Sequence, residues 1–131
     1  MKRFHLLMLL AFAVAMMAGC GILNPAGPYA GDRVLYEADS TIVSAYQVFD
    51  TFLKWEKENR DALFRQTPKI KETADQIRER GPVWIASAIK MRDAYREVPG
   101  AKTKSDLQSA LDFLHQGINE AVLYMSKYPK G

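Results

Sequence analysis

Three long stretches of apolar residues, each recurring every three or four positions, limit what this chain can fold into. Residues three and four apart lie on one face of an α-helix, whereas a half-buried strand alternates every second residue. No strand-like alternation of useful length is present in the sequence. The recurring positions are Leu35, Ala38, Ile42, Ala45, Phe49 and Phe52; then Ile70, Ala74, Ile77, Gly81, Trp84, Ala88, Met91 and Tyr95; and finally Leu107, Leu111, Leu114, Ile118, Ala121, Met125 and Tyr128. Each stretch predicts an amphipathic helix whose apolar stripe needs a partner to cover it.

Apolar residues on either side widen these stripes, and we expect most of them to be core. They are Val34, Tyr46, Val48, Leu53 and Trp55 beside the first stripe, Ile85 and Ile89 beside the second, and Ala110, Phe113 and Val122 beside the third. A tryptophan opposite Gly81 would fill the space that the glycine leaves. Glu56 and Asn59 fall on the first stripe, which predicts that the last turns of that helix are solvated.

Turn signals separate the stretches. Asp32 is a suitable N-cap for the first helix, and Thr67-Pro68 combines an N-cap with a proline at the first helical position. Val98-Pro99-Gly100 ends the second helix, and Ser105-Asp106-Leu107-Gln108 has the spacing of a capping box for the third. The predicted fold is therefore all-α: an antiparallel three-helix up-down-up bundle with coiled-coil-like seams, although stripes this wide could also close by dimerisation.

Gly81 and Pro82 interrupt the second predicted helix. Both residues disfavour a helix interior, and proline removes one backbone hydrogen bond. The apolar period nevertheless keeps its phase across them. We expect a helix kink or a short break at this point, with no domain boundary.

Residues 1–19 have the layout of an export signal. A basic pair, Lys2 and Arg3, precedes an apolar run over residues 4–17 that only His5 interrupts. As a helix, about 14 residues span roughly 21 Å, which is less than the hydrocarbon thickness of about 30 Å. The run predicts a cleaved signal peptide that would be a poor permanent membrane span.

Met17-Ala18-Gly19-Cys20 resembles the lipobox of bacterial lipoproteins. The resemblance covers only the first twenty residues. It implies cleavage between Gly19 and Cys20, and a diacylglycerol and an N-acyl chain carried by Cys20. It also implies that Gly21, in place of an aspartate, directs the protein to the outer membrane, facing the periplasm, if the source is diderm. The alternative is an ordinary signal peptide followed by a chance cysteine.

The rest of the chain divides into a tether and one domain. Residues 20–31 are rich in glycine and proline without an apolar period, which predicts a short, semi-rigid tether to the membrane. Residues 32–131 form the predicted bundle domain. Without residues 1–19 the chain has 112 residues, enough for one core.

Charge and cysteine content exclude several classes of function. The formal charge of +3 includes Lys2 and Arg3, so the mature side chains carry only +1. A nucleic-acid binder needs a broad basic face, so we expect no nucleic-acid partner. Cys20 is the only cysteine, and disulfides therefore cannot hold the fold.

The residues available for catalysis are few. His115 is the only histidine beyond the signal peptide, and no thiol remains once Cys20 is lipidated. Asp112 and His115 have the spacing that di-iron bundles use, but a second such pair is missing. Haem ligation by His115 with Met91 or Met125 is the alternative to a simple boundary histidine. We expect no enzyme, no metal site and no cofactor other than the lipid on Cys20.

The acidic residues of the second predicted helix could form a cation site, but their pattern favours a solvated surface. Glu72, Asp75 and Glu79 share one helical face, and basic residues alternate with them. Such interleaving is typical of an ion-paired exposed face.

Basic residues gather where the topology predicts the membrane-distal end of the bundle. They are Arg65, Lys69, Lys71, Lys127 and Lys130, with aromatic residues nearby. This predicted partner-binding tip would suit an acidic protein or the carboxylates of a cell-wall peptide. The alternative is local, because cations at helix C-termini complement the helix dipole without any partner.

The sequence therefore favours a membrane-anchored envelope lipoprotein that acts as a non-catalytic binding or structural module. Its expected partner is another envelope protein or a cell-wall component. Two alternatives remain open. One is a helical-bundle carrier that opens at Gly81-Pro82 for haem or another apolar ligand, and the other is an exclusion or immunity lipoprotein of a virus or plasmid.

Overall fold

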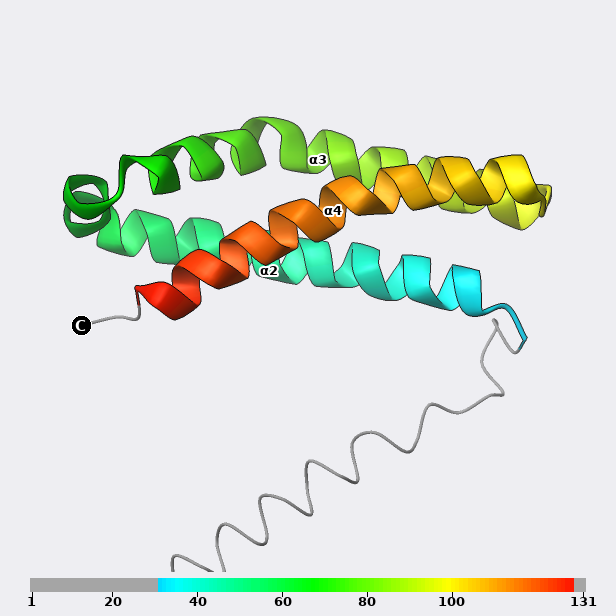
Figure 1. Cartoon of the computed structure of the whole chain (residues 1–131), viewed down its shortest axis with the longest axis horizontal. Helices are drawn as coiled ribbons and strands as arrows, with labels where there is room; N and C mark the ends of the chain where they lie inside the picture. The colour runs from blue at the N-terminus through cyan, green and yellow to red at the C-terminus, as the bar shows by residue number, and fades with distance from the viewer. Residues whose placement is uncertain (1–30, 129–131) are drawn as a thin grey trace, which may run out of the picture. The chain divides into compact units, whose positions relative to one another are not determined.

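The computed structural model describes residues 31–128, which form three α-helices and, within this range, no strand. The helices are α2 (Arg33–Gln66), α3 (Pro68–Glu97) and α4 (Ala101–Lys127). Every pair of helices is in contact, as Figure 1 shows. The prediction of an all-α three-helix bundle is confirmed. The signal peptide, the lipobox with Cys20, the tether up to residue 30, and Lys130 lie outside the described residues.

Short connections and side-chain contacts fix which helix ends meet. Thr67 alone links α2 to α3, and these two helices join at one end of the bundle in Figure 1. The Thr67 hydroxyl donates to the Tyr128 hydroxyl at 2.8 Å, which places the end of α4 beside this connection. At the other end, Arg92 Nη1 lies 2.6 Å from Asp39 Oδ1 and ties the last turns of α3 to the start of α2.

The predicted stripes form the core. Almost all of their residues are buried or half-buried, and the fully buried large side chains come from all three helices. Three of the flanking residues that we expected in the core are exposed instead. They are Tyr46, Phe113 and Val122, with exposed fractions of 56%, 55% and 46%. A three-helix bundle covers only part of each helix circumference, so positions at the edge of a stripe stay in contact with water. Within residues 31–128, no helix combines the length and hydropathy that crossing a bilayer requires.

The helix starts agree with the turn signals at two of three places. Helix α2 begins directly after Asp32, and α3 begins at Pro68 after an extended Thr67. The prediction that a capping box at Ser105 starts the third helix is wrong, because α4 already begins at Ala101 with Gly100 as the N-cap. The Thr103 hydroxyl donates to the carbonyls of Val98 and Gly100, at 2.8 and 3.1 Å, and thereby fastens the connection to the first turn of α4.

Tertiary contacts support Asp39-Ser40-Thr41 near the start of α2, three residues that have low helix propensity. The pKa of Arg92 is lowered by burial, but the hydrogen bonds to Asp39 and Asp93 outweigh this effect and raise it above its ordinary value. Two residues after Asp39, the buried Thr41 has its hydroxyl oxygen 3.2 Å from His115 Nε2 on α4. Polar residues that disfavour an isolated helix here therefore connect α2 to both of its neighbours.

Glu56 is an exception to the expectation that the last turns of α2 are solvated, although residues 57, 58 and 60–62 are exposed as expected. Its side chain is fully buried. Arg60 donates to both carboxylate oxygens, at 2.9 and 3.3 Å, and Arg78 of α3 donates to Oε2. Two guanidinium groups supply enough charge and hydrogen bonds for a buried carboxylate, so a polar residue can occupy a stripe position.

Helix α3 continues through Gly81 and Pro82 without a break, and Figure 1 shows it bowed over its middle part. The aromatic ring opposite Gly81 belongs to Phe49, which corrects the expectation of a tryptophan. A Cβ atom at Gly81 would lie 3.3 Å from Phe49 Cδ2, and one at Gly117 of α4 would lie 2.8 Å from Phe49 Cζ. The two glycines therefore let the helices close around this one ring.

Candidate functional site

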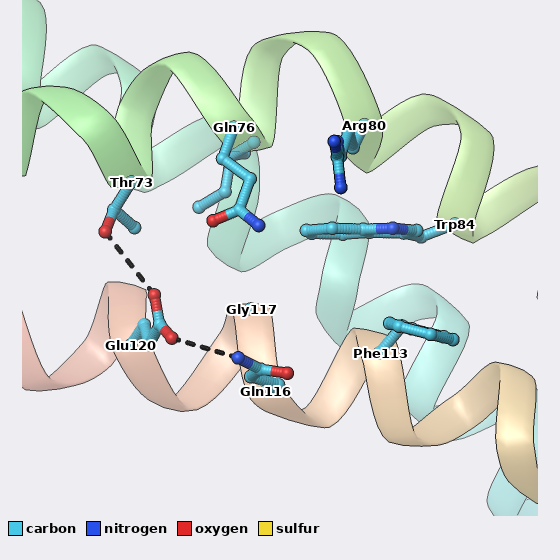
Figure 2. Close-up of a pocket in the computed structure, with 9 residues that line it drawn as sticks. Thr73, Gln76, Arg80, Trp84, Phe113, Gln116, Gly117 and Glu120 are labelled. Atoms are coloured by element: carbon cyan, nitrogen blue, oxygen red, sulfur yellow. Dashed lines mark hydrogen bonds between the residues drawn. The ribbon is translucent and has the colours of Figure 1, made fainter.

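A small groove with polar and aromatic walls lies between α3 and α4; it is shown in Figure 2 and is here called the α3–α4 groove. It has a volume of about 80 Å³ and is open to solvent. Helix α3 contributes Thr73, Gln76, Ile77, Arg80 and Trp84, and α4 contributes Phe113, Gln116, Gly117 and Glu120. Steps of three and four residues bring each set onto one face of its helix.

Two aromatic side chains form one end of the groove. The rings of Trp84 and Phe113 stack with their centroids 6.3 Å apart and their planes 16° from parallel. Phe49 meets Trp84 edge-on from the core, at 6.4 Å and 62°. The contact with Phe49 fixes the half-buried Trp84, while Phe113 remains 55% exposed. The pair offers a ready surface on which a planar or apolar group can pack.

The opposite end of the groove carries a carboxylate without a cation. Thr73 donates to Glu120 Oε2 at 3.4 Å, and Gln116 donates to Oε1 at 3.3 Å (Figure 2). Both donors are neutral, and within residues 31–128 Glu120 forms no ion pair. The groove therefore presents an oriented negative charge that a ligand can neutralise.

Arg80 supplies the complementary charge beside the aromatic pair. It lies one helical turn before Trp84, and Figure 2 shows both side chains toward the same end of the groove. The other arginines of α3, Arg78, Arg92 and Arg96, all pair with carboxylates, but Arg80 has no such partner in the part of the chain that the structure describes. An exposed guanidinium with all its donors available is a natural site for a carboxylate.

A second depression, here called the α2–α3 groove, is apolar and larger, at about 360 Å³. It lies where Gly81 and Pro82 of α3 face α2, and Tyr46, Leu53 and Ile85 are among its lining residues. Asp50 and Arg78 also border it, although these side chains already pair with Lys54 and Glu56. None of the lining residues is a histidine, cysteine or methionine, so this groove lacks the usual nitrogen and sulfur ligands of haem iron.

Three of the five cations of the predicted tip have contacts close by: Arg65, Lys71 and Lys127. Arg65 donates to the backbone carbonyl of Asp61 at 2.9 Å, and Lys71 pairs with Asp75 at 2.8 Å. Lys127 lies over the ring of Tyr128, 5.6 Å from its centroid. Lys69 is exposed at the start of α3, and Lys130 lies outside the described residues. These contacts agree with helix-end electrostatics, and binding at the tip stays a prediction.

The other candidate residues lie apart from both grooves or in ion pairs. His115 has Thr41 as its hydrogen-bond partner, and within residues 31–128 it forms no hydrogen bond with Met91 or Met125. Asp75 accepts hydrogen bonds from Lys71 and Arg78, at 2.8 Å each, and these interactions, Lys71 first, lower the pKa of its carboxyl. In the part of the chain that the structure describes, no three potential metal ligands cluster together.

Sequence reasoning missed the α3–α4 groove as a unit. Gln76, Arg80 and Gln116 carry no apolar period and read as ordinary surface. The available signal was Gly117, a glycine within a strongly helical segment, next to the stripe and between Phe113 and Glu120 on the same face. A glycine at such a position indicates a close approach between helices or a missing side chain at a groove floor.

Comparisons with protein-family models, with curated proteins and with solved structures found no match to this chain.

Proposed function

We propose that this protein is a lipid-anchored component of the bacterial cell envelope whose helical domain is a non-catalytic binding module. The α3–α4 groove is its binding site, and an envelope protein or cell-wall component is its partner. The observation that carries the proposal is the pairing of an exposed aromatic surface with two uncompensated charges, Arg80 and Glu120, in one groove. Polar groups without an internal partner beside an apolar surface are typical of a binding site.

We further propose that the helices pack as an antiparallel up-down-up bundle with coiled-coil-like seams, anchored through Cys20 and the tether of residues 20–31. In a diderm source the domain faces the periplasm from the outer membrane. A groove along the side of the bundle then stays accessible to partners within the envelope.

The anchor is tested by Cys20→Ser in cells that are fed a labelled fatty acid. We expect the wild-type protein to carry the label and to sediment with membranes, because the acyl chains attach at Cys20. The variant should lose all of the label and accumulate as the unprocessed precursor. Equal labelling of both proteins would contradict lipidation at Cys20.

Site-specific crosslinking in cells tests the binding site. A photoreactive residue at position 116 samples the α3–α4 groove, one at 69 samples the tip, and one at 47 is a matched control on the exposed face of α2. We expect adducts from position 116 at least tenfold more abundant than those from position 47. Adducts from position 69 alone would move the binding site to the predicted tip, and equal adducts from all three would contradict both.

The α2–α3 groove favours a second candidate function, a carrier of an apolar molecule. It lies at Gly81-Pro82, and its walls are mainly aliphatic and aromatic. Native mass spectrometry of protein from its own cells separates the two functions. A carrier retains an apolar ligand that Ala86→Trp displaces, since Ala86 is an exposed residue lining this groove.

A further inference from the structure

The groups along the α3–α4 groove follow a fixed order. Figure 2 shows Glu120 with Thr73 at one end, Gln76 and Gln116 in the middle, and Arg80 with the aromatic pair at the other end. The sequence of chemical groups is thus an anion, two amides, a cation and an apolar surface. Helix geometry holds this order because each group lies about one turn from the next.

The order matches the groups of a peptide with two free ends. A peptide has an ammonium at one end, amide groups in the middle, and a carboxylate next to the last side chain. Glu120 is complementary to the ammonium, the two glutamines to a peptide amide, and Arg80 to the carboxylate. The aromatic pair is adjacent to Arg80 and can therefore accept the side chain of the C-terminal residue.

The spacing sets the length of such a peptide. Glu120 is hydrogen-bonded to Thr73. Thr73 precedes Arg80 by seven residues, so the two positions are separated by roughly 10 Å along the axis of α3. Each extended residue spans about 3.5 Å. The two charge-assisted hydrogen bonds, of about 3 Å each, leave about 4 Å for the ligand if both lie along the groove and about 10 Å if both lie across it. The opposite charges of the ligand are then separated by one or two peptide bonds.

Resting on the proposed function of this groove, we propose that the ligand is a short zwitterionic peptide of two or three residues with an apolar or aromatic C-terminal side chain. The groove, at about 80 Å³, does not enclose such a molecule. The peptide therefore lies along the open groove with one edge in water. Its charged ends give most of the selectivity, and its amide and side chain align it.

Calorimetric titration of the full chain in detergent micelles with Ala-Ala-Phe and Ala-Phe tests the proposal. Each peptide is compared with its N-acetyl form, which removes the ammonium, and its C-terminal amide, which removes the carboxylate. We expect the free peptide to bind at least tenfold more tightly than either blocked form. Free phenylalanine, whose charges are too close together, should bind at least tenfold more weakly than the better of the two peptides.

Two variants assign each end to its residue. In Arg80→Gln, amidation of the peptide should no longer change the affinity, while acetylation still does. Glu120→Gln can still accept the hydrogen bond from Thr73. In this variant, acetylation of the peptide should no longer change the affinity, while amidation still does. Lys104→Gln, an exposed cation on the first turn of α4 outside the groove, should behave as the wild type. Thermal melting of all three variants checks that they remain folded.

The outcomes separate this inference from the proposed function. Equal affinity for free and blocked peptides, or no measurable binding of any peptide, would overturn the zwitterionic ligand. If position 116 still forms adducts in cells, the groove remains a binding site for another partner. Failure of both experiments would overturn the site as well.

Discussion

Gly117→Val is expected to lower the free energy of unfolding by about 3 kcal/mol. A Cβ atom at this position lies 2.8 and 3.0 Å from two ring carbons of Phe49 and 3.4 Å from Trp84 Cζ3. Phe49 cannot move away easily, because it is buried and a second glycine, Gly81 of α3, lies so close to it that a Cβ atom there would be only 3.3 Å from Phe49 Cδ2. Helix α4 must therefore move away from α2 to admit any side chain at this position, and this loosens the core around Phe49.

Gly117→Ala is the more diagnostic variant, since helix propensity and packing predict opposite signs. Propensity alone favours alanine over glycine in a helix interior by about 1 kcal/mol. We expect a net loss of about 1 to 2 kcal/mol in urea unfolding followed by tryptophan fluorescence, because overpacking outweighs that gain. Phe49→Leu should cost less in the Gly117→Ala background than in the wild type. A Gly117→Ala protein more stable than the wild type would show that the helices do not close on Phe49.

The double variant Arg60→Met with Arg78→Met is expected to lower the free energy of unfolding by about 3 to 5 kcal/mol. These two guanidinium groups are the charged partners of Glu56, whose side chain is fully buried. Their own side chains are 48% and 34% exposed, so water already solvates part of each. The cost arises mainly from the carboxylate, which is left in the core without a counter-charge.

Two comparisons make this prediction specific. Adding Glu56→Leu to the double variant should restore most of the lost stability, because the buried carboxylate is then gone. The matched control is Lys54→Met with Lys71→Met, which also removes two cations, but from pairs with Asp50 and Asp75 whose side chains are 63% and 43% exposed. We expect the control to cost less than about 1 kcal/mol. Equal losses in both double variants would mean that Glu56 is not buried in an ion-pair network.

The α3–α4 groove shows how far sequence reasoning reaches toward a site. Trp84 was recognisable as a stripe residue, and it does pack against the core ring of Phe49. In the sequence, Arg80 and Glu120 resemble any other surface charges. What distinguishes them is that neither forms an ion pair within residues 31–128. The lack of a partner is a property of three-dimensional neighbours, and no spacing along one helix reveals it.

The predicted tip illustrates the converse. Its cations were visible as a cluster in the sequence, and Thr67 and Tyr128 do bring the ends of their helices together. The structure adds that Arg65 and Lys127 have local contacts, with a backbone carbonyl and an aromatic ring. These contacts explain part of the tip's charge without a partner. The proposed binding site is therefore the α3–α4 groove and not the tip.

The sequence by itself determined the number of helices, their apolar faces and the start of α3 at Pro68. These features depend on the period of an α-helix and on proline, which act within a few residues. Only the tertiary structure decided that Glu56 is buried, that Phe49 lies between two glycines, and that Arg80 and Glu120 border one groove. Each of these depends on contacts between helices, where residues far apart in the chain share the same desolvated or half-open space. Local propensity cannot specify such neighbours, because the energy that selects them comes from packing and charge compensation across the bundle.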